Sequence, residues 1–261
     1  MLNGSDRVPV LVVGATGRVG RAVITELLRL GRPVRALVRR PPPTPFPPGV
    51  EVVVGDLTDP DSLPPALAGV EAVFLVWAAG PATVSDVVAR LARSVQRVVF
   101  LSSPHQTPHP FFRQPNPMAA LHADIERELA TSGLPSVILR PGMFAANTVA
   151  WWTPQIRAGD VVRWPYGAVE TAPIDERDIA AVAVRALSEA SLAGGDYVLT
   201  GPAALSHARQ VAVIGEVLGR RLALHELSPD DFRRETSPPG RRRPSRCCSL
   251  RGGRRSGIPR T

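Results

Sequence analysis

The first half of the chain alternates short apolar runs with segments whose apolar residues recur every three or four positions. The apolar runs are rich in Val, Ile and Leu, which is typical of strands that are buried on both faces of a sheet. We expect strands at 8–13, 33–38, 51–55, 72–77, 97–103 and 136–142, separated by helices at 21–30, 59–69, 83–95 and 117–134. This alternation predicts a parallel, doubly wound α/β sheet with helices on both faces.

After residue 143 the alternation becomes irregular. We interpret the aromatic segments 144–152 and 161–167 as loops. They are followed by an expected helix at 174–190, a strand at 196–201, a helix at 207–220 and a strand at 221–227. We therefore divide the chain into a core at 1–143, a small lobe at 144–232 that is integrated with the core over the carboxyl edge of the sheet, and a basic, disordered tail at 233–261.

The net charge of +8 belongs to the tail and not to the expected fold. From Arg233 onward the chain has ten arginines and one acid, whereas the preceding residues have 21 arginines and 22 acids. A basic tail can bind nucleic acid or anionic lipid, but no aromatic residue interleaves these arginines, so we do not expect a nucleic-acid partner beyond non-specific binding by the tail. The tail can also be a solvated extension or the product of an altered reading frame.

Other features of composition restrict the class of protein. Hydrophobic residues make up 44% of the 261 residues, enough to fill a core, while no apolar run reaches the roughly 18 residues of a membrane span. The only cysteines, Cys247 and Cys248, are adjacent and cannot form a disulfide framework. The N-terminus shows no secretion signal. We expect a cytoplasmic protein with no membrane association.

A glycine-rich turn, GATGRVG, separates the first strand from the first helix. Gly14 permits a tight turn, Gly17 permits close approach of the backbone to a pyrophosphate, and Gly20 permits close packing of helix on strand. The helix that starts in this turn directs free N–H groups toward an anion. The turn predicts dinucleotide binding, with Gly14, Thr16, Gly17, Arg18, Val19 and Gly20 as the cofactor-binding residues.

The end of the second strand bears on which dinucleotide is bound. Enzymes that hold the ribose of NAD usually place an acid there, but this chain has Arg39 and Arg40. Guanidinium groups can pair with a 2′-phosphate, so NADP(H) is favoured over NAD(H), with Arg39 preferred to Arg40. Asp56 follows the third strand and is placed to reach the adenine, unless it serves as a helix cap or turn acid. Leu57 and Ala78 complete the expected cofactor contacts.

Several motifs together resemble the NmrA-like branch of the atypical short-chain dehydrogenases/reductases. They are GATGRVG, GDL, LSS at 101–103, H-x-x-x-E at 122–126, SGL at 132–134, LRPGMFAAN at 139–147, DERDIA at 175–180 and LTGPAALS at 199–206. The resemblance covers roughly residues 8–230 and implies a Rossmann-type fold with a small C-terminal substrate lobe. The branch contains NAD(P)H-dependent quinone reductases, relatives of isoflavone reductases, and redox-sensing regulators. The H-x-x-x-E helix and the SGL that follows it are most similar to the quinone-reductase-like members.

The chain departs from the wider superfamily at its proton-transfer pair. The resemblance places a tyrosine and a lysine where this sequence has Met118 and His122; the chain has no lysine, and its only tyrosines are Tyr166 and Tyr197. His122 can replace the lysine's hydrogen bond to the nicotinamide ribose and can shuttle a proton. Hydride transfer to an electron-poor quinone needs positioning more than a protein acid.

Three residues form the candidate catalytic set: His122, Ser102 and Asn147. His122 and Glu126 lie one turn apart on the expected helix and can also be a simple surface pair. Ser102 or Ser103, at the carboxyl end of the fifth strand, can bond nicotinamide or substrate, or alternatively serve in a turn. The resemblance places Asn147 near the nicotinamide. We expect Asp175 and Asp178 to be an N-cap and a lobe-docking acid.

Aromatic residues gather in the expected loops and lobe: Phe111, Phe112, Trp151, Trp152 and Trp164. They predict either an apolar pocket for a planar ligand or packing of the lobe against the sheet. His105 and His109 are a poor metal site without further ligands, so we expect no metal.

These observations favour an NADPH-dependent reductase of a small quinone, enone or aromatic acceptor. A non-catalytic NADP(H)-sensing regulator is the alternative. A sugar-epimerase-like isomerase is disfavoured because it needs the Tyr–Lys pair. The sequence leaves the formation of a homodimer open.

Overall fold

The expected apolar runs form the strands of one parallel sheet in the computed structural model, which describes residues 8–104 and 117–236. The strands are β1 (Val10–Val13), β2 (Val34–Val38), β3 (Val50–Val54), β4 (Ala72–Leu75), β5 (Arg97–Leu101), β6 (Ser136–Pro141), β7 (Val161–Pro165), β8 (Glu170–Thr171), β9 (Asp196–Leu199), β10 (Leu205–Ser206) and β11 (Ala223–Leu227). The α-helices are α1 (Arg18–Arg29), α2 (Pro64–Leu67), α3 (Val84–Ser94), α4 (Pro117–Thr131), α5 (Asn147–Ala158), α6 (Glu176–Ser188), α7 (His207–Leu218) and α8 (Pro229–Thr236), and the 3₁₀ helices are η1 (Pro60–Ser62), η2 (Pro81–Thr83) and η3 (Ala190–Leu192).

The central sheet has seven strands in the order β3-β2-β1-β4-β5-β6-β9, and every neighbouring pair is parallel. The order reverses beside β1, because β1 pairs with β2 on one side and with β4 on the other. A doubly wound α/β sheet is therefore confirmed. Such sheets bind ligands beyond the carboxyl ends of their strands at the point of reversal.

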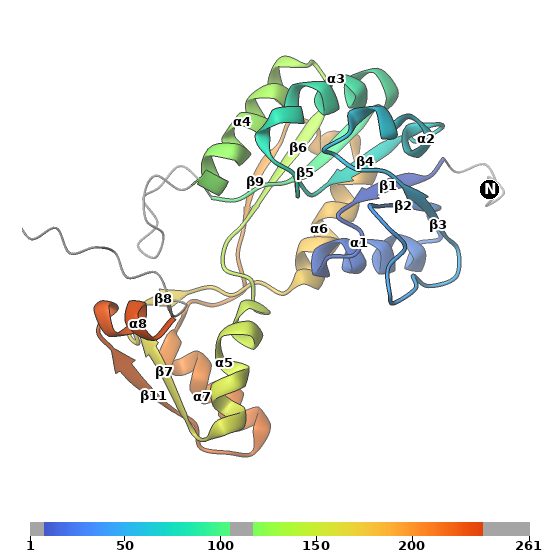
Figure 1. Ribbon diagram of the computed structural model, residues 1–261. Helices are drawn as coiled ribbons and strands as arrows, with labels where there is room; N and C mark the ends of the chain where they lie inside the picture. The colour runs from blue at the N-terminus through green and yellow to red at the C-terminus, as the bar shows by residue number, and fades with distance from the viewer. Residues whose placement is uncertain (1–7, 105–116, 237–261) are drawn as a thin grey trace, which may run out of the picture.

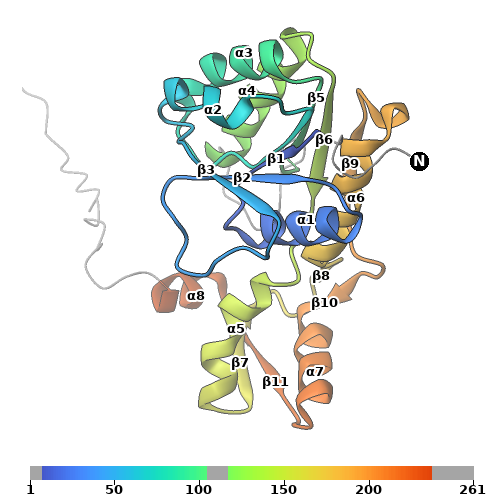
Figure 2. The same ribbon diagram turned by 90° about the vertical axis from the view of Figure 1, so that its right-hand side faces the viewer.

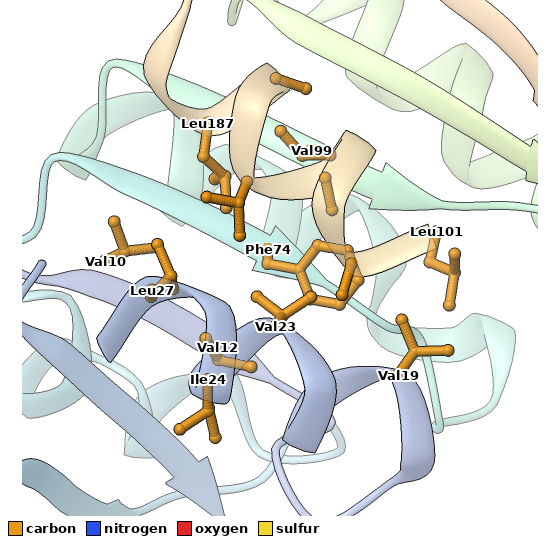
Figure 3. Packing of buried hydrophobic residues seen from close by; sticks show 14 of the residues in the cluster. Val10, Val12, Val19, Val23, Ile24, Leu27, Phe74, Val99, Leu101 and Leu187 are labelled. Carbon is orange, nitrogen blue, oxygen red and sulfur yellow. The ribbon is translucent and has the colours of Figure 1, made fainter. Parts of the chain in front are cut away.

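Helices cover both faces of the sheet and create two separate apolar layers. Helices α1 and α6 pack side by side on one face, while α2, α3 and α4 lie on the other (Figure 1). In the first layer, Val23 and Leu27 of α1 meet Phe74 of β4 and Leu187 of α6 (Figure 3). Ile125 and Leu129 of α4 belong to the second layer. Burial of this apolar surface fixes the strands and positions their carboxyl ends.

The lobe lies apart from the sheet layers, below them in Figures 1 and 2, and is formed by α5, α7, α8 and the strands β7, β8, β10 and β11. Strand β11 pairs with β7 in parallel and β10 with β8 antiparallel. Its small core contains Trp152, Val162, Val211 and Leu222. Within the range 144–232, which we expect to form a lobe integrated with the core, α6 packs on α1 and β9 completes the central sheet.

Two expectations differ from the structure. The segment 144–152, expected as a loop, contains the start of helix α5, and 161–167 contains β7. Only Trp152 of α5 is fully buried and Pro154 lies inside the helix, so the segment lacks the amphipathic periodicity that marks a helix. Helix α8 continues to Thr236, so the first residues of the expected tail are helical. The remainder of the tail lies outside the described residues.

Three short connections join core and lobe, and they are hydrogen-bonded to one another. The backbone N–H of Gly142 donates to Leu199 O at 2.9 Å, that of Ile174 to Met143 O at 2.9 Å, and that of Gly201 to Ala172 O at 3.1 Å. No side chain fits at Gly201, where a Cβ would overlap the carbonyl of Pro173. The three connections therefore form one packed region between the core and the lobe, and we call this region the waist.

Candidate functional site

The glycine turn has the geometry of a phosphate-binding loop. Gly14 has φ +77°, and a Cβ there would lie 2.7 Å from Cβ of Val76, so only glycine fits. A Cβ on Gly20 would overlap the carbonyl oxygen of Gly14, which lets α1 pack directly on the turn. Gly17 is the N-cap of α1 and is exposed; the only atom near its Cβ position is Gly14 O at 3.2 Å.

This loop fits the pyrophosphate of a dinucleotide. It follows β1 at the point where the strand order reverses, and the free N–H groups of the first turn of α1 face outward from it. Thr16 and Arg18 are exposed on the loop, whereas Val19 is buried and packs in the core. Ala78, after β4, is exposed on the other side of the reversal. The predicted contacts from the glycine turn and β4 thus share one edge of the sheet.

The guanidinium groups at the end of β2 are available to an anion. Arg39 and Arg40 directly follow β2 and are exposed. Within the described chain neither side chain has an ion pair or a hydrogen bond, in contrast to Arg35, which binds Glu51 at 2.8 Å. The described residues place no carboxylate directly after β2, where an NAD-binding enzyme usually has one.

Asp56 and Leu57 lie in the turn after β3 and have structural contacts. Oδ1 of Asp56 accepts a hydrogen bond from the backbone N–H of Thr58 at 2.9 Å, which is the turn role that the sequence left open. Leu57 is buried, and its carbonyl accepts the Thr83 hydroxyl at 2.7 Å. The adenine contact predicted for these residues stays a prediction.

Arg18 joins the glycine loop to the lobe. Its guanidinium donates to the carbonyl of Ala146 at 2.9 Å, and Ala146 is the residue before α5. Asn147 is the first residue of α5 and is partly exposed, with its backbone N–H bonded to Phe144 O at 3.1 Å. The structure thereby brings Asn147 to the same side of the molecule as the glycine loop. Its predicted role beside nicotinamide stays a prediction.

Ser102, Ser103 and His122 meet at the carboxyl end of β5. His122 is nearly buried on the face of α4 that packs on the sheet, and Nδ1 of its ring lies 2.8 Å from Oγ of Ser103. The ring also contacts Phe100 edge-on, with centroids 5.6 Å apart. Ser102 is buried, and its hydroxyl donates to Oε1 of Glu126 at 2.5 Å. Adjacent serines therefore have different partners.

A buried ion pair that sequence reasoning missed lies behind these residues. Arg140 of β6 donates to Oε2 of Glu126 at 2.5 Å and also pairs with Asp196 of β9. Burial alone would lower the pKa of Arg140, but its hydrogen bonds to Asp196 and Glu126 outweigh that cost and raise the pKa. A charged residue inside the apolar run SVILRPG was the signal, since a buried charge requires partners. Glu126 is thus more than the helix-surface partner of His122.

The aromatic residues of the lobe pack mainly against one another. The rings of Trp151 and Trp164 stack with centroids 5.1 Å apart, and Trp164 contacts Trp152 and Phe232 edge-on at 5.8 and 4.9 Å. His207 contacts Trp152 and Trp164 at 6.2 and 6.3 Å. This cluster supports lobe packing, with Trp151 37% exposed at its edge. His105, His109, Phe111 and Phe112 lie outside the described residues.

No described residue replaces the missing tyrosine at its expected place. Met118 lies at the start of α4 and is 54% exposed. Tyr197 packs against the core on β9, and Tyr166 lies in the lobe after β7.

Among the described residues, no group of three or more His, Cys, Asp or Glu side chains can hold a metal ion. In the same part of the chain, every helix is too short or too polar to pass through a lipid bilayer.

Comparisons with known proteins agree with this geometry. A family model described as NAD(P)H-binding matches residues 14–190. A (4-alkanoyl-5-oxo-2,5-dihydrofuran-3-yl)methyl phosphate reductase from Streptomyces griseus subsp. griseus is 39% identical over 86% of this chain and 79% of its own length. An NAD(P)H azoreductase from Xenophilus azovorans is 32% identical over 81% of this chain and 74% of its own length.

A solved structure shows the same arrangement with a related sequence. An NADPH-dependent quinone oxidoreductase from Escherichia coli, complexed with NADPH, superposes with a TM-score of 0.73 at 26% identity, covering 88% of this chain and 83% of the other. The resemblance to quinone-reductase-like proteins is thereby confirmed. The chain belongs to the NAD(P)H-binding family of oxidoreductases.

Proposed function

We propose that the protein transfers hydride from NADPH to a small, electron-poor conjugated acceptor, an enone or a quinone. The observation that carries this proposal is the combination of a complete phosphate-binding turn with an exposed Met118 where an acid is expected. The site thus has groups that hold and orient a dinucleotide but lacks the tyrosine that protonates a poor acceptor. A conjugated acceptor stabilises the charge left by hydride addition, so water can supply the proton.

The relatives support the same class of acceptor. Their names describe reductases of an alkanoyl-substituted dihydrofuranone phosphate, of azo compounds and of quinones. The oxo-dihydrofuran and the quinone each have a C=C bond conjugated with a carbonyl group, and an azo compound has a reducible N=N bond. The partly exposed Trp151 at the edge of the aromatic cluster supplies an apolar wall for such a planar molecule.

The preference for NADPH over NADH rests on the end of β2. Arg39 and Arg40 are exposed there without ion-pair partners in the described chain, so both guanidinium groups can bind an anion. Changing Arg39 to Ala removes a charge-assisted hydrogen bond to the 2′-phosphate, so NADPH should bind about 10- to 100-fold more weakly while NADH binding stays unchanged. Fluorescence titration with both cofactors measures this change.

Arg29 provides the matched control for Arg39. It is exposed on α1 and paired with Glu26, and it lies at the opposite end of the helix from the glycine turn. Arg29→Ala should leave both affinities unchanged. Equal affinity of the unaltered protein for NADH and NADPH would contradict the assignment of Arg39.

Turnover separates this function from the sensor alternative. Purified protein with NADPH is mixed with simple quinones and enones, and the loss of nicotinamide absorbance is followed. Oxidation of NADPH that depends on the acceptor supports the reductase. Clear cofactor binding without turnover of any acceptor would instead support a regulator that senses NADP(H), which the exposed Met118 also permits.

His122 is the protein group proposed to orient the nicotinamide ribose. It comes from the helix position that the superfamily's lysine occupies, and its ring is held in the wall of the site by Ser103 and Phe100. His122→Ala should weaken cofactor binding or turnover. If cofactor binding and turnover of His122→Ala equal those of the original protein, His122 is excluded from the site.

A further inference from the structure

We propose that Arg21 is a positioning residue for recognition of the 2′-phosphate of NADPH, because it fastens the loop 41–49 to α1 and so fixes the backbone that carries Arg39 and Arg40. This role rests on the proposed preference for NADPH. The guanidinium of Arg21, near the start of α1, donates a hydrogen bond to the carbonyl oxygen of Thr44 at 3.0 Å. It also lies over the ring of Phe46, with Cζ 5.0 Å from the ring centroid.

The loop 41–49 is attached to the core on the side of Arg21 that leads to β3. Phe46 is half-buried and packs against the apolar layer that contains α1. Gly49 has φ +90°, and its Cβ position lies 3.8 Å from Cδ2 of Leu28 on the same helix. The loop runs beside α1 between β2 and β3 (Figure 1). The contacts of Arg21 therefore extend this attachment toward the end of β2.

The composition of the loop lets a contact at Thr44 influence the residues that precede it. Six of the nine residues 41–49 are prolines, and each proline fixes its own φ. Pro41 also restricts the backbone of Arg40 to extended conformations. Once Thr44 is held on α1, the short stiff segment that joins it to β2 has few other paths. The backbone of Arg39 and Arg40 is thereby fixed from both sides.

The effect of Arg21 should be specific to the 2′-phosphate. Both contacts of its side chain described above are with the loop 41–49, whereas the glycine turn holds its own shape, with the N–H of Gly17 donating to Gly14 O at 3.0 Å. NADH lacks the 2′-phosphate and makes no use of Arg39. A loop that is ordered in advance lowers the entropy cost of binding that phosphate. Loss of Arg21 should therefore weaken binding of NADPH and spare binding of NADH.

The test compares Arg21→Met with Arg21→Lys in the full-length chain. Methionine removes the guanidinium but keeps an unbranched side chain that suits a helix. Fluorescence titration should show NADPH binding about 3- to 10-fold more weakly to Arg21→Met, with NADH binding unchanged. Lysine keeps a charge over the ring and an N–H donor, so Arg21→Lys should retain most of the affinity for NADPH.

Arg29→Met is the matched control for Arg21→Met. It makes the same substitution on the same helix, but Arg29 is paired with Glu26 at the end of α1 that lies away from the glycine turn. Its affinities for NADPH and NADH should equal those of the original protein.

Phe46 provides a second pair of variants. Phe46→Leu removes the ring beneath the guanidinium but keeps an apolar side chain against the core, so it should weaken NADPH binding in the same direction as Arg21→Met. Phe46→Tyr keeps the ring and should retain the affinity. Because both residues act through one contact, the double variant Arg21→Met/Phe46→Leu should bind NADPH more tightly than the two single effects multiplied together would give.

The ratio of the two affinities decides the proposal. Unchanged NADPH binding in Arg21→Met would overturn it. Equal weakening of NADPH and NADH would also overturn it, since Arg21 would then support α1 as a whole. Equal affinity of the original protein for both cofactors would overturn it together with the preference for NADPH.

Turnover is a separate measurement. If no acceptor is reduced but Arg21→Met loses affinity for NADPH alone, the reductase function fails and the role of Arg21 stands. If acceptors are reduced and Arg21→Met binds both cofactors as the original protein does, the role of Arg21 fails alone.

Discussion

Single residues set the shape of the cofactor loop because backbone atoms leave no space for side chains. Gly14 and Gly20 are close to each other, and each would force a Cβ into occupied space. Gly17 differs, since its side is open to solvent. The first and third glycines of the motif therefore shape the protein, while the second leaves the loop open to solvent, where we expect the cofactor.

Gly20→Ala should disrupt both folding and binding. The added methyl overlaps the carbonyl of Gly14, so α1 has to move away from the turn, at a cost of about 1–3 kcal/mol in the free energy of unfolding. Urea denaturation measures the loss of stability, and titration with NADPH measures the loss of binding. Gly17→Ala, with its nearest contact at 3.2 Å, should retain most stability while binding less cofactor. Equal stability losses in both variants would contradict this division.

Ser102→Ala should reduce stability through the buried ion pair. It removes a hydrogen bond between the Ser102 hydroxyl and the carboxylate of Glu126, and the loss of a buried hydrogen bond to a charged group costs about 1–3 kcal/mol. Thermal unfolding followed by circular dichroism measures the effect. In Glu126→Gln that side chain carries no charge. The Ser102→Ala substitution should therefore reduce the free energy of unfolding less in the Glu126→Gln protein than in the unaltered protein. Simple additivity would show that the serine does not act through Glu126.

At the scale of elements, the hydrophobic pattern predicts those strands and helices that bury one continuous face. The buried run of β1 and β4 and the apolar stripe of α1 are visible in the sequence, and the structure confirms them. Helix α5 was not predictable in this way, because it buries only Trp152. The segment 59–69 became η1 and the short helix α2, since Pro64 and Pro65 interrupt it.

The candidate site was predictable to the same extent. The glycine turn and the strand ends follow from local pattern and topology, so Gly14, Ser102 and His122 were found at one edge of the sheet. The partners of Glu126 were not found, because Arg140 and Asp196 reach it from other strands and pairing between distant residues leaves no periodic signal.

Helix α7 introduces a titratable group into the lobe core. His207 starts the helix and is buried against Trp152 and Trp164, with Nδ1 donating to Tyr166 O at 3.0 Å. Burial lowers its pKa below the ordinary 6.5, and the backbone carbonyls of Tyr166 and Pro165 oppose this only in part. The folded state therefore favours the neutral ring.

The lobe should lose stability as the pH falls below about 6.5. The unfolded chain takes up a proton on His207 before the folded chain does, so the contribution is present above the unfolded pKa and is lost as the pH falls toward the folded pKa. His207→Gln cannot titrate and should lose less stability between pH 7.5 and 5.5. Urea denaturation followed by tryptophan fluorescence compares the two proteins. If the free energy of unfolding changes with pH by the same amount in both proteins, His207 is not the titrating group.

At the scale of the whole molecule, α6 connects the parts. The chain enters it from the lobe, and the helix then packs on α1 beneath the sheet. At the other end of α6, the guanidinium of Arg97, at the start of β5, donates hydrogen bonds to the carbonyl oxygens of Ala186 at 3.0 Å and Glu189 at 2.9 Å. Asp175 caps the helix by accepting the backbone N–H of Arg177, which confirms the predicted N-cap.

Asp175→Ala should reduce the stability of the whole protein at neutral pH. The side chain of Arg177 and then its backbone N–H lower the pKa of Asp175 from 3.8 to about 2. The side chain is partly exposed, so the loss should be about 1 kcal/mol, the usual value of a cap. Because the folded pKa is lowered, this contribution is present above pH 3.8 and disappears as the pH falls through about 2.

Denaturation of the variant and the unaltered protein between pH 7 and pH 2 checks both parts of this expectation. Asp178→Ala removes an acid from the same helical turn without removing the cap, so it serves as the matched control. A difference for Asp175→Ala that persists unchanged to the lowest pH would show that the carboxylate charge is not responsible.

The waist between core and lobe bears on how this architecture can diversify. The lobe is built from two separate stretches of chain, and its three connections are bonded to one another across a point where Gly201 leaves no room for a side chain. Replacing this lobe with the lobe of another protein is difficult, because the backbone of the new lobe has to match the core at three connections at the same time. Point substitutions on α5 and in the aromatic cluster, in contrast, leave all three junctions of the waist unchanged.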